Sequence, residues 1–96
     1  MLGQRINELR QAFGWNQVEL AKRLGVAKQT VSNWENDNIQ PSIEMLIRLA
    51  KLFNVTTDYL LGFDQTPRLS MEGLPTEVVA HIALLIEDYK KYNTDK

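Results

Sequence analysis

The sequence predicts an all-α protein with five short helices in one domain and a sixth helix after a linker. Three observations support this fold class. Apolar residues recur at intervals of three and four, which is the spacing of one helical face. Capping residues such as Asn, Ser and Thr precede several of these segments, and Gly or Asn follows them. No alternating segment is long enough for a strand, and no Asn-Gly or Asp-Gly hairpin turn occurs.

The first two predicted helices are short and separated by a turn. The shared apolar face of the first helix is made of Leu2, Ile6, Leu9 and Phe13. Gly14 follows as its end, because glycine adopts the left-handed conformation without strain. Asn16 is the predicted N-cap of the second helix, and Glu19 three residues later completes a capping-box pattern. Gly25 is expected to end this helix.

The third predicted helix covers about residues 27–36, with Val31 and Trp34 facing inward. A polar loop follows it. Ser42 is the expected N-cap of the fourth helix, and Asn54 is expected to end it, since Asn tolerates the left-handed conformation.

The last two predicted helices differ in length. Thr56 caps a short fifth helix that Gly62 ends. Pro75 suits the first turn of a longer sixth helix that reaches about Tyr92. The predicted division of the chain is a domain at 1–63, a linker at 64–74 and a C-terminal helix at 75–96.

The composition argues against several classes of protein. With no cysteine and one histidine, the chain has no disulfide or thiolate zinc site, and no metal, cofactor or catalytic activity is expected. The longest apolar run, 82–86, is far shorter than the ~20 residues that span a bilayer. We therefore expect no membrane segment, and a cytoplasmic location. The net charge of -1 means that any DNA affinity comes from local clustering.

Residues 16–35 are the most informative segment. They predict two short helices joined by a tight turn at Gly25, and the second helix turns amides, a hydroxyl and a cation outward. Such side chains contact base edges when a helix lies in the major groove of DNA.

This pattern extends over most of the chain. Residues 3–62 resemble the Xre, or Cro/CI-like, helix-turn-helix family of phage and bacterial repressors. The matching residues, in order, are Arg5-Ile6, Leu9-Arg10, Asn16-Gln17, Glu19-Leu20-Ala21, Leu24-Gly25-Val26, Val31-Ser32, Trp34-Glu35, Pro41-Ser42 and Leu60-Leu61-Gly62. The resemblance implies a five-helix lambda-repressor-like domain in a DNA-binding transcriptional regulator, expected to repress from a palindromic operator as a dimer.

The resemblance also implies roles for single residues. The expected base-contacting side chains are Lys28, Gln29, Ser32 and Asn33. The expected phosphate-contacting residues are Asn16, Gln17, Asn36 and Ser42, with capping alone as the alternative for Asn16 and the favoured role for Ser42. Arg10 and Glu35 are expected to form a structural salt bridge between the first and third helices.

Two positions depart from the family pattern. Ala27 stands where the third helix often has a Ser or Thr cap, which forfeits about 1 kcal/mol. Asp37 brings a carboxylate into a loop that often carries Gly and Lys. We therefore expect few phosphate contacts and a shallow dependence of affinity on salt.

The sixth predicted helix carries an apolar stripe that needs a cover. Its expected dimerisation residues are Val78, Ile82, Leu85 and Tyr89, spaced four, three and four. The alternative is a helix folded back onto its own domain. A second function also stays open, in which the chain is an antitoxin or an adaptor whose tail binds another protein.

Overall fold

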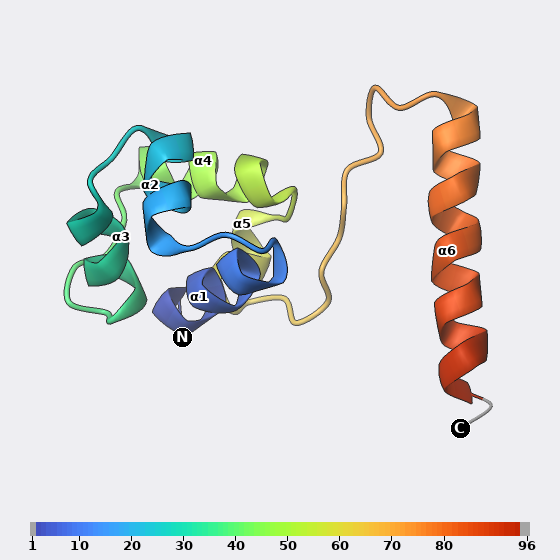
Figure 1. The fold of residues 1–96 in the computed structure, drawn as a ribbon, viewed down its shortest axis with the longest axis horizontal. Helices are drawn as coiled ribbons and strands as arrows, with labels where there is room; N and C mark the ends of the chain where they lie inside the picture. Colours follow the sequence, from blue (N-terminus) through green and yellow to red (C-terminus); the bar gives the residue numbers. More distant parts are fainter. Residues whose placement is uncertain (1, 95–96) are drawn as a thin grey trace.

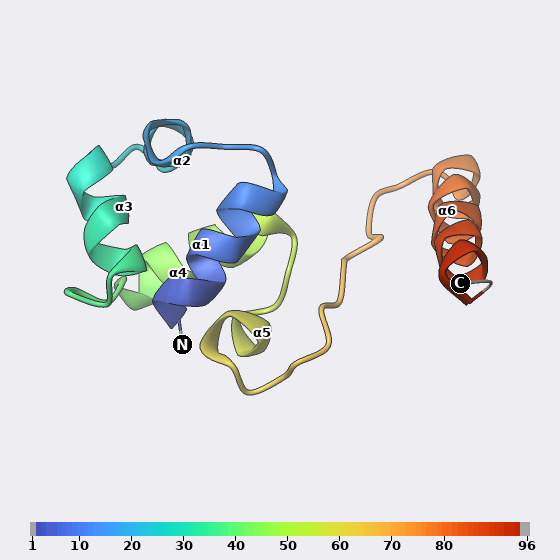
Figure 2. The ribbon, with the colours of Figure 1, turned by 60° about the horizontal axis from the view of Figure 1, so that its bottom comes forward.

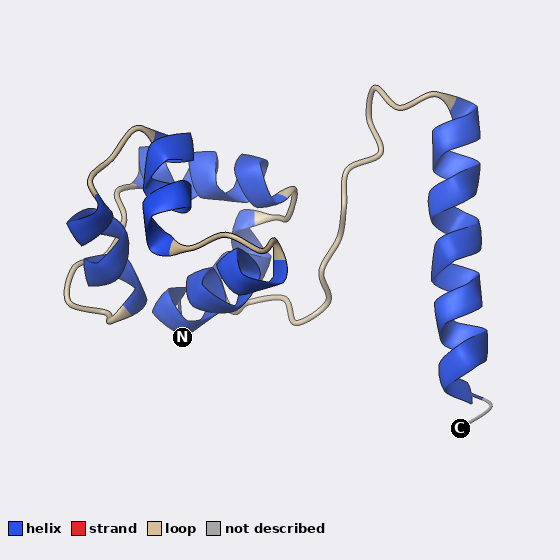
Figure 3. Ribbon diagram, viewed as in Figure 1, coloured by secondary structure: helices blue, strands red, loops and turns tan. Residues whose placement is uncertain are grey.

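The computed structural model describes residues 2–94, and these form six helices with no strand (Figure 1). The all-α prediction is confirmed, and Figure 3 shows that loops alone connect the helices. The helices are α1 (Leu2–Ala12), α2 (Gln17–Leu24), α3 (Lys28–Glu35), α4 (Ile43–Phe53), α5 (Thr57–Leu61) and α6 (Thr76–Thr94).

Local side chains set where three of the helices begin. Each of three N-cap side chains accepts a hydrogen bond from the backbone N–H three residues later: Asn16 from Glu19, Ser42 from Met45 and Thr56 from Tyr59. Of the two hydrogen bonds of a capping box, the structure shows the one from the Glu19 N–H to the Asn16 side chain. The Glu19 carboxylate contacts Arg23 at 3.5 Å. Ala27 precedes α3 without a side-chain cap, as the sequence predicted.

The predicted helix ends also lie in the left-handed region. Gly25 and Gly62 have φ angles of 71° and 85°, and Asn54 has a φ of 55°. The third helix is shorter than the predicted 27–36 because its two outermost residues are the caps. The sixth begins after Pro75 and continues to Thr94, beyond the predicted end.

The first five helices enclose one apolar core. In Figure 2, α1 crosses the bundle, where it contacts α3 and α5, and α2 packs against α3. Every core side chain is at most 5% exposed. The core consists of Ile6, Leu20, Ala21, Leu24, Val31, Trp34, Leu49, Ala50, Phe53 and Leu60.

An aromatic cluster covers the junction between α1 and α2. The Trp15 ring stacks on Phe53 with centroids 6.0 Å apart, and Phe13 contacts both rings. The Arg23 guanidinium carbon lies over the Trp15 ring, 4.2 Å from its centroid. Trp15 thus joins the turn before α2 to the core.

The predicted linker is partly attached to the bundle. Asn54 and Ser70 exchange two hydrogen bonds of 3.4 Å, and Arg5 donates to Gln65 at 3.1 Å. After these contacts the chain leads to α6, which stands apart from the bundle (Figure 1). Within residues 2–94, no helix has the length and apolarity needed to cross a membrane.

Candidate nucleic-acid interface

The helix pair α2–α3 presents one polar face. Val31 and Trp34 anchor α3 in the core, so the opposite side of this helix faces outward. On that side lie the four predicted base-contacting residues. Lys28 and Gln29 are exposed, and Ser32 and Asn33 are half-exposed. The helix therefore combines a fixed apolar side with polar groups that a ligand can reach.

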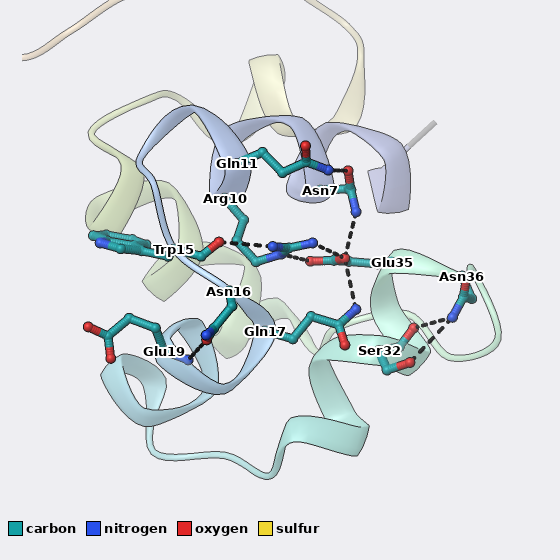
Figure 4. A network of polar contacts seen from close by, with 10 residues as sticks. All are labelled: Asn7, Arg10, Gln11, Trp15, Asn16, Gln17, Glu19, Ser32, Glu35 and Asn36. Atoms are coloured by element: carbon teal, nitrogen blue, oxygen red, sulfur yellow. Dashed lines mark hydrogen bonds and ion pairs between the residues drawn. The ribbon is translucent and has the colours of Figure 1, made fainter.

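Two side-chain pairs lie on this outward region. Gln29 Nε2 donates to Asn33 Oδ1 at 3.1 Å. Asn36 Nδ2 donates to the backbone oxygen of Ser32 at 3.0 Å and to its Oγ at 3.3 Å (Figure 4). Both pairs are four residues apart, a spacing at which helical side chains meet, so the sequence held the signal for them.

Below this face, Glu35 joins three helices. Its carboxylate accepts from Arg10 Nε at 2.7 Å and from Arg10 Nη2 at 3.1 Å. It also accepts from Asn7 Nδ2 at 2.8 Å and Gln17 Nε2 at 3.1 Å (Figure 4). The structure thus pairs Arg10 with Glu35, and adds Asn7 and Gln17, whose part in this network the sequence analysis missed.

The network keeps Glu35 ionised although its side chain is only 3% exposed. Burial by itself raises the pKa of this carboxyl. The hydrogen bonds from Arg10, Gln17 and Asn7, together with the charge of Arg10, lower it by more, so the pKa lies below its usual 4.5. Arg10 also donates to the backbone oxygen of Trp15 at 2.9 Å. One carboxylate therefore sets how α1, α2 and α3 meet.

Gln17, a predicted phosphate contact, makes a hydrogen bond within the protein. Its amide nitrogen bonds Glu35, which ties the first turn of α2 to the last turn of α3. Among the other predicted phosphate contacts, Asn16 and Ser42 use their side-chain oxygens as helix caps. The side chains of Asn16, Ser42 and Asn36 all belong to exposed residues.

Asp37 caps a helix from a distant part of the chain. Its Oδ1 accepts a hydrogen bond of 3.1 Å from the backbone N–H of Gly3, in the first turn of α1. This carboxylate lies where the helix dipole favours negative charge. A Cβ on Gly3 would lie 2.5 Å from the backbone oxygen of Trp34, so the close approach requires glycine. The carboxylate that departs from the family pattern in this loop therefore holds the α3–α4 loop against α1.

The chain is similar to several known proteins. It is 42% identical over 78 residues to the HTH-type transcriptional regulator ImmR of Bacillus subtilis. The aligned residues make up 81% of this chain and 61% of ImmR. The chain spans about 60% of the length of the curated relatives that it matches first.

Solved structures show the same fold. The c2 repressor of Salmonella phage P22, in complex with a synthetic operator, matches with a TM-score of 0.63 at 34% identity, over 67% of this chain and 97% of that one. The complex of SinR and SinI matches with a TM-score of 0.61 at 27% identity, and covers both chains fully. The model of the family described as "Helix-turn-helix" matches residues 6–60, more than half of the chain. The protein therefore belongs to this helix-turn-helix family, as its resemblance to Xre or Cro/CI-like regulators predicted.

Proposed function

We propose that this protein regulates transcription by binding duplex DNA sequence-specifically, with α3 in the major groove. The observation that carries the proposal is the outward polar face of α3 on a helix whose other side is buried and whose end is fixed by Glu35. Two similarities support it. ImmR is named as a transcriptional regulator, and the P22 c2 repressor was solved on an operator.

The proposed contacts divide into two groups. Base edges would be contacted by Lys28, Gln29, Ser32 and Asn33, which lie on the outward side of α3. Phosphates would be contacted by Asn16, Gln17, Asn36 and Ser42, which lie near the ends of α2, α3 and α4. The free backbone N–H groups of the first turn of α2 would favour an anion as well.

The proposed oligomer is a twofold dimer formed through α6. Leu85 and Tyr89 are both 70% exposed, and Val78 is 39% exposed. Ile82 is half-buried, and its neighbour Ile86 lines an apolar groove of about 540 Å³ against the bundle and the linker. The open edge of this stripe is therefore Val78, Leu85 and Tyr89, with Ile82 at its border. An exposed apolar stripe of this kind is typical of a surface that binds a partner.

A dimer would match the needs of DNA recognition. One recognition helix contacts few base pairs, whereas a twofold dimer contacts two half-sites about 34 Å apart in a palindrome. A protein that occupies such a site in the cytoplasm can repress by excluding polymerase, and P22 c2 is named as a repressor. We therefore propose repression as the regulatory outcome.

The salt dependence of binding should be shallow. Arg23 is engaged by Trp15 and Glu19, which leaves Lys22 and Lys28 as the neighbouring exposed cations on α2 and α3. Each phosphate contact adds about 0.9 to the log–log slope of affinity against salt. A titration at several salt concentrations should give a small slope, and a steep one would contradict the few contacts proposed.

Selection of bound duplexes from a random-sequence pool tests the function itself. The full chain should enrich a palindrome whose half-sites are about one helical turn apart. Enrichment of a single half-site would contradict the dimer, and no enrichment would contradict DNA recognition.

A second candidate function uses α6 to bind a different protein, as in an antitoxin or an adaptor. The same open edge of α6 favours it, and the SinR–SinI complex shows that a relative assembles with another protein. Sedimentation of the pure chain separates the two candidates. A dimer at micromolar concentration supports self-association, whereas a monomer throughout favours the partner protein.

A further inference from the structure

The two amide side chains in the middle of α3 are bound to each other in the free protein. Gln29 Nε2 lies 3.1 Å from Asn33 Oδ1, one helical turn further on. Gln29 is exposed and Asn33 is half-exposed, so their bond lies on the surface that the proposed function turns toward DNA. No core contact forces the two amides together, because Val31 and Trp34 anchor the opposite side of the helix.

The bond determines what the pair can offer to a ligand. It occupies one hydrogen of Gln29 Nε2 and one lone pair of Asn33 Oδ1. Wholly outside the bond remain the Gln29 Oε1 acceptor and the Asn33 Nδ2 donor, while Nε2 keeps its second hydrogen and Oδ1 its second lone pair. If both amides turn by 180°, the bond runs from Asn33 to Gln29, and one donor and one acceptor again stay outside. The pair therefore presents one wholly uncommitted acceptor group and one wholly uncommitted donor group in either arrangement.

This combination matches one base. In the major groove adenine offers an acceptor, N7, beside a donor, the N6 amine. Guanine offers two acceptors, thymine one acceptor and a methyl group, and cytosine one donor. Among single bases, adenine alone complements an acceptor paired with a donor.

We propose that Gln29 and Asn33 act as one unit that selects a single adenine in each half-site. The inference rests on the proposed DNA binding and adds the target base. Each amide holds the other in place before DNA arrives, so less side-chain freedom is lost on binding. The alternative is that each amide contacts its own base independently. The two cases differ in how the effects of two substitutions combine.

The neighbouring pair on the same helix provides a matched control. Asn36 donates to the backbone oxygen and the Oγ of Ser32, a bond separate from the one between Gln29 and Asn33. Asn36→Ala also removes one exposed amide near the recognition surface. Because Asn36 is a proposed phosphate contact, its removal should weaken binding to every duplex alike and leave the ratio of affinities at the adenine position unchanged.

The test starts from the duplex that the full chain selects from a random pool. Its adenine is then replaced in turn by guanine, by 7-deazaadenine, which lacks the N7 acceptor, and by purine, which lacks the N6 amine. Dissociation constants are measured by fluorescence anisotropy for the full chain and for Gln29→Ala, Asn33→Ala, the double variant and Asn36→Ala. Circular dichroism melting verifies that each variant is folded.

The full chain should prefer adenine over each replacement by about five- to 150-fold. Gln29→Ala and Asn33→Ala should each remove this preference at the same position, and the double variant should remove no more. Asn33→Asp keeps an acceptor for Gln29 but loses the outward donor, so it should lose the preference too.

Other outcomes would overturn the inference. One is that the two single variants change preference at two different positions, with losses that multiply in the double variant. Another is that the shared position demands a base other than adenine. Failure of the full chain to enrich any duplex has a different meaning, because it would overturn the proposed DNA binding itself.

Discussion

The bundle α1–α5 and the helix α6 carry the same kind of apolar periodicity but use it differently. In the bundle, ten apolar side chains are at most 5% exposed, and each of the five helices contributes at least one. In α6, Leu85 and Tyr89 stay 70% exposed. A periodic apolar stripe therefore shows that a helix needs a partner surface, but does not show whether its own chain provides that surface.

The largest effect is expected where a charge is buried in the bundle. Glu35→Ala leaves Arg10 without its ionic partner and takes the acceptor away from Asn7 and Gln17. Breaking a buried pair of this kind costs about 3–5 kcal/mol, a large part of the stability of a small domain. Denaturant unfolding followed by tryptophan fluorescence measures this loss.

An ion pair on the surface of the same bundle is the control for Glu35. Glu19 and Arg23 have side chains about two-fifths exposed, and removal of Glu19 should cost less than about 1 kcal/mol. Equal unfolding midpoints for Glu35→Ala and the parent protein would contradict the structural role of the network.

The next effect should appear in α6 and leave the bundle intact. Leu85→Ala removes part of the open edge, so a dimer held there should dissociate about ten- to 150-fold more readily, the equivalent of 1.5–3 kcal/mol for a buried leucine. Sedimentation equilibrium measures this change. Unfolding at concentrations where the chain is monomeric should stay within about 0.5 kcal/mol of the parent.

Leu84 gives a matched comparison within the same helix. It is 57% exposed but lies off the stripe that contains Val78 and Leu85. Leu84→Ala should leave self-association unchanged. If both leucines matter equally, the proposed edge is wrong.

A smaller effect, in the opposite direction, is expected at the start of α3. Ala27 has an extended backbone and no side-chain bond to the first turn. Ala27→Ser should supply the missing cap and stabilise the bundle by about 1 kcal/mol. A raised melting temperature at unchanged self-association would show again that the bundle and α6 respond separately, and an unchanged or lowered one would count against the cap.

The pH dependence of stability should also originate in the bundle. Because the pKa of Glu35 is lowered in the folded protein, its carboxylate stabilises the fold above the usual value of 4.5, and this contribution is lost as the pH falls through the folded pKa. Glu35→Gln should therefore flatten the dependence of unfolding on pH below about 4.5.

Asp64 in the linker is the control for this titration. The N–H of Thr66 and the side chain of Arg68 lower the pKa of its carboxyl, but the Asp64 side chain is partly exposed to solvent, whereas that of Glu35 is buried. Asp64→Asn should alter the pH profile less than Glu35→Gln, and a larger change would indicate that the linker contributes more to the fold than its contacts suggest.

The prediction of helix boundaries succeeded because the determinants are local. Asn16, Ser42 and Thr56 each bond a backbone group three residues away, and Gly25 and Asn54 end their helices by their own conformations. The outward position of the polar α3 side chains is also a local matter, because it follows from the burial of Val31 and Trp34, which lie three residues apart on the other side of the same helix.

Contacts between distant segments were decided only by the tertiary structure. Gly3 and Asp37 are 34 residues apart, and Gln17 and Glu35 are 18 apart, so no local pattern distinguishes these partners from other polar residues. The bonds between Asn54 and Ser70, which hold the linker to the bundle, are of the same kind.

The sequence by itself thus determined the helices, their ends and the family, because capping and periodicity act within one or two turns. The tertiary structure decided that Asp37 caps α1, that Glu35 joins three helices, and that one edge of α6 stays open. These features depend on how close the packed helices bring residues that the chain itself keeps far apart, and spacing along the sequence contains no measure of that distance.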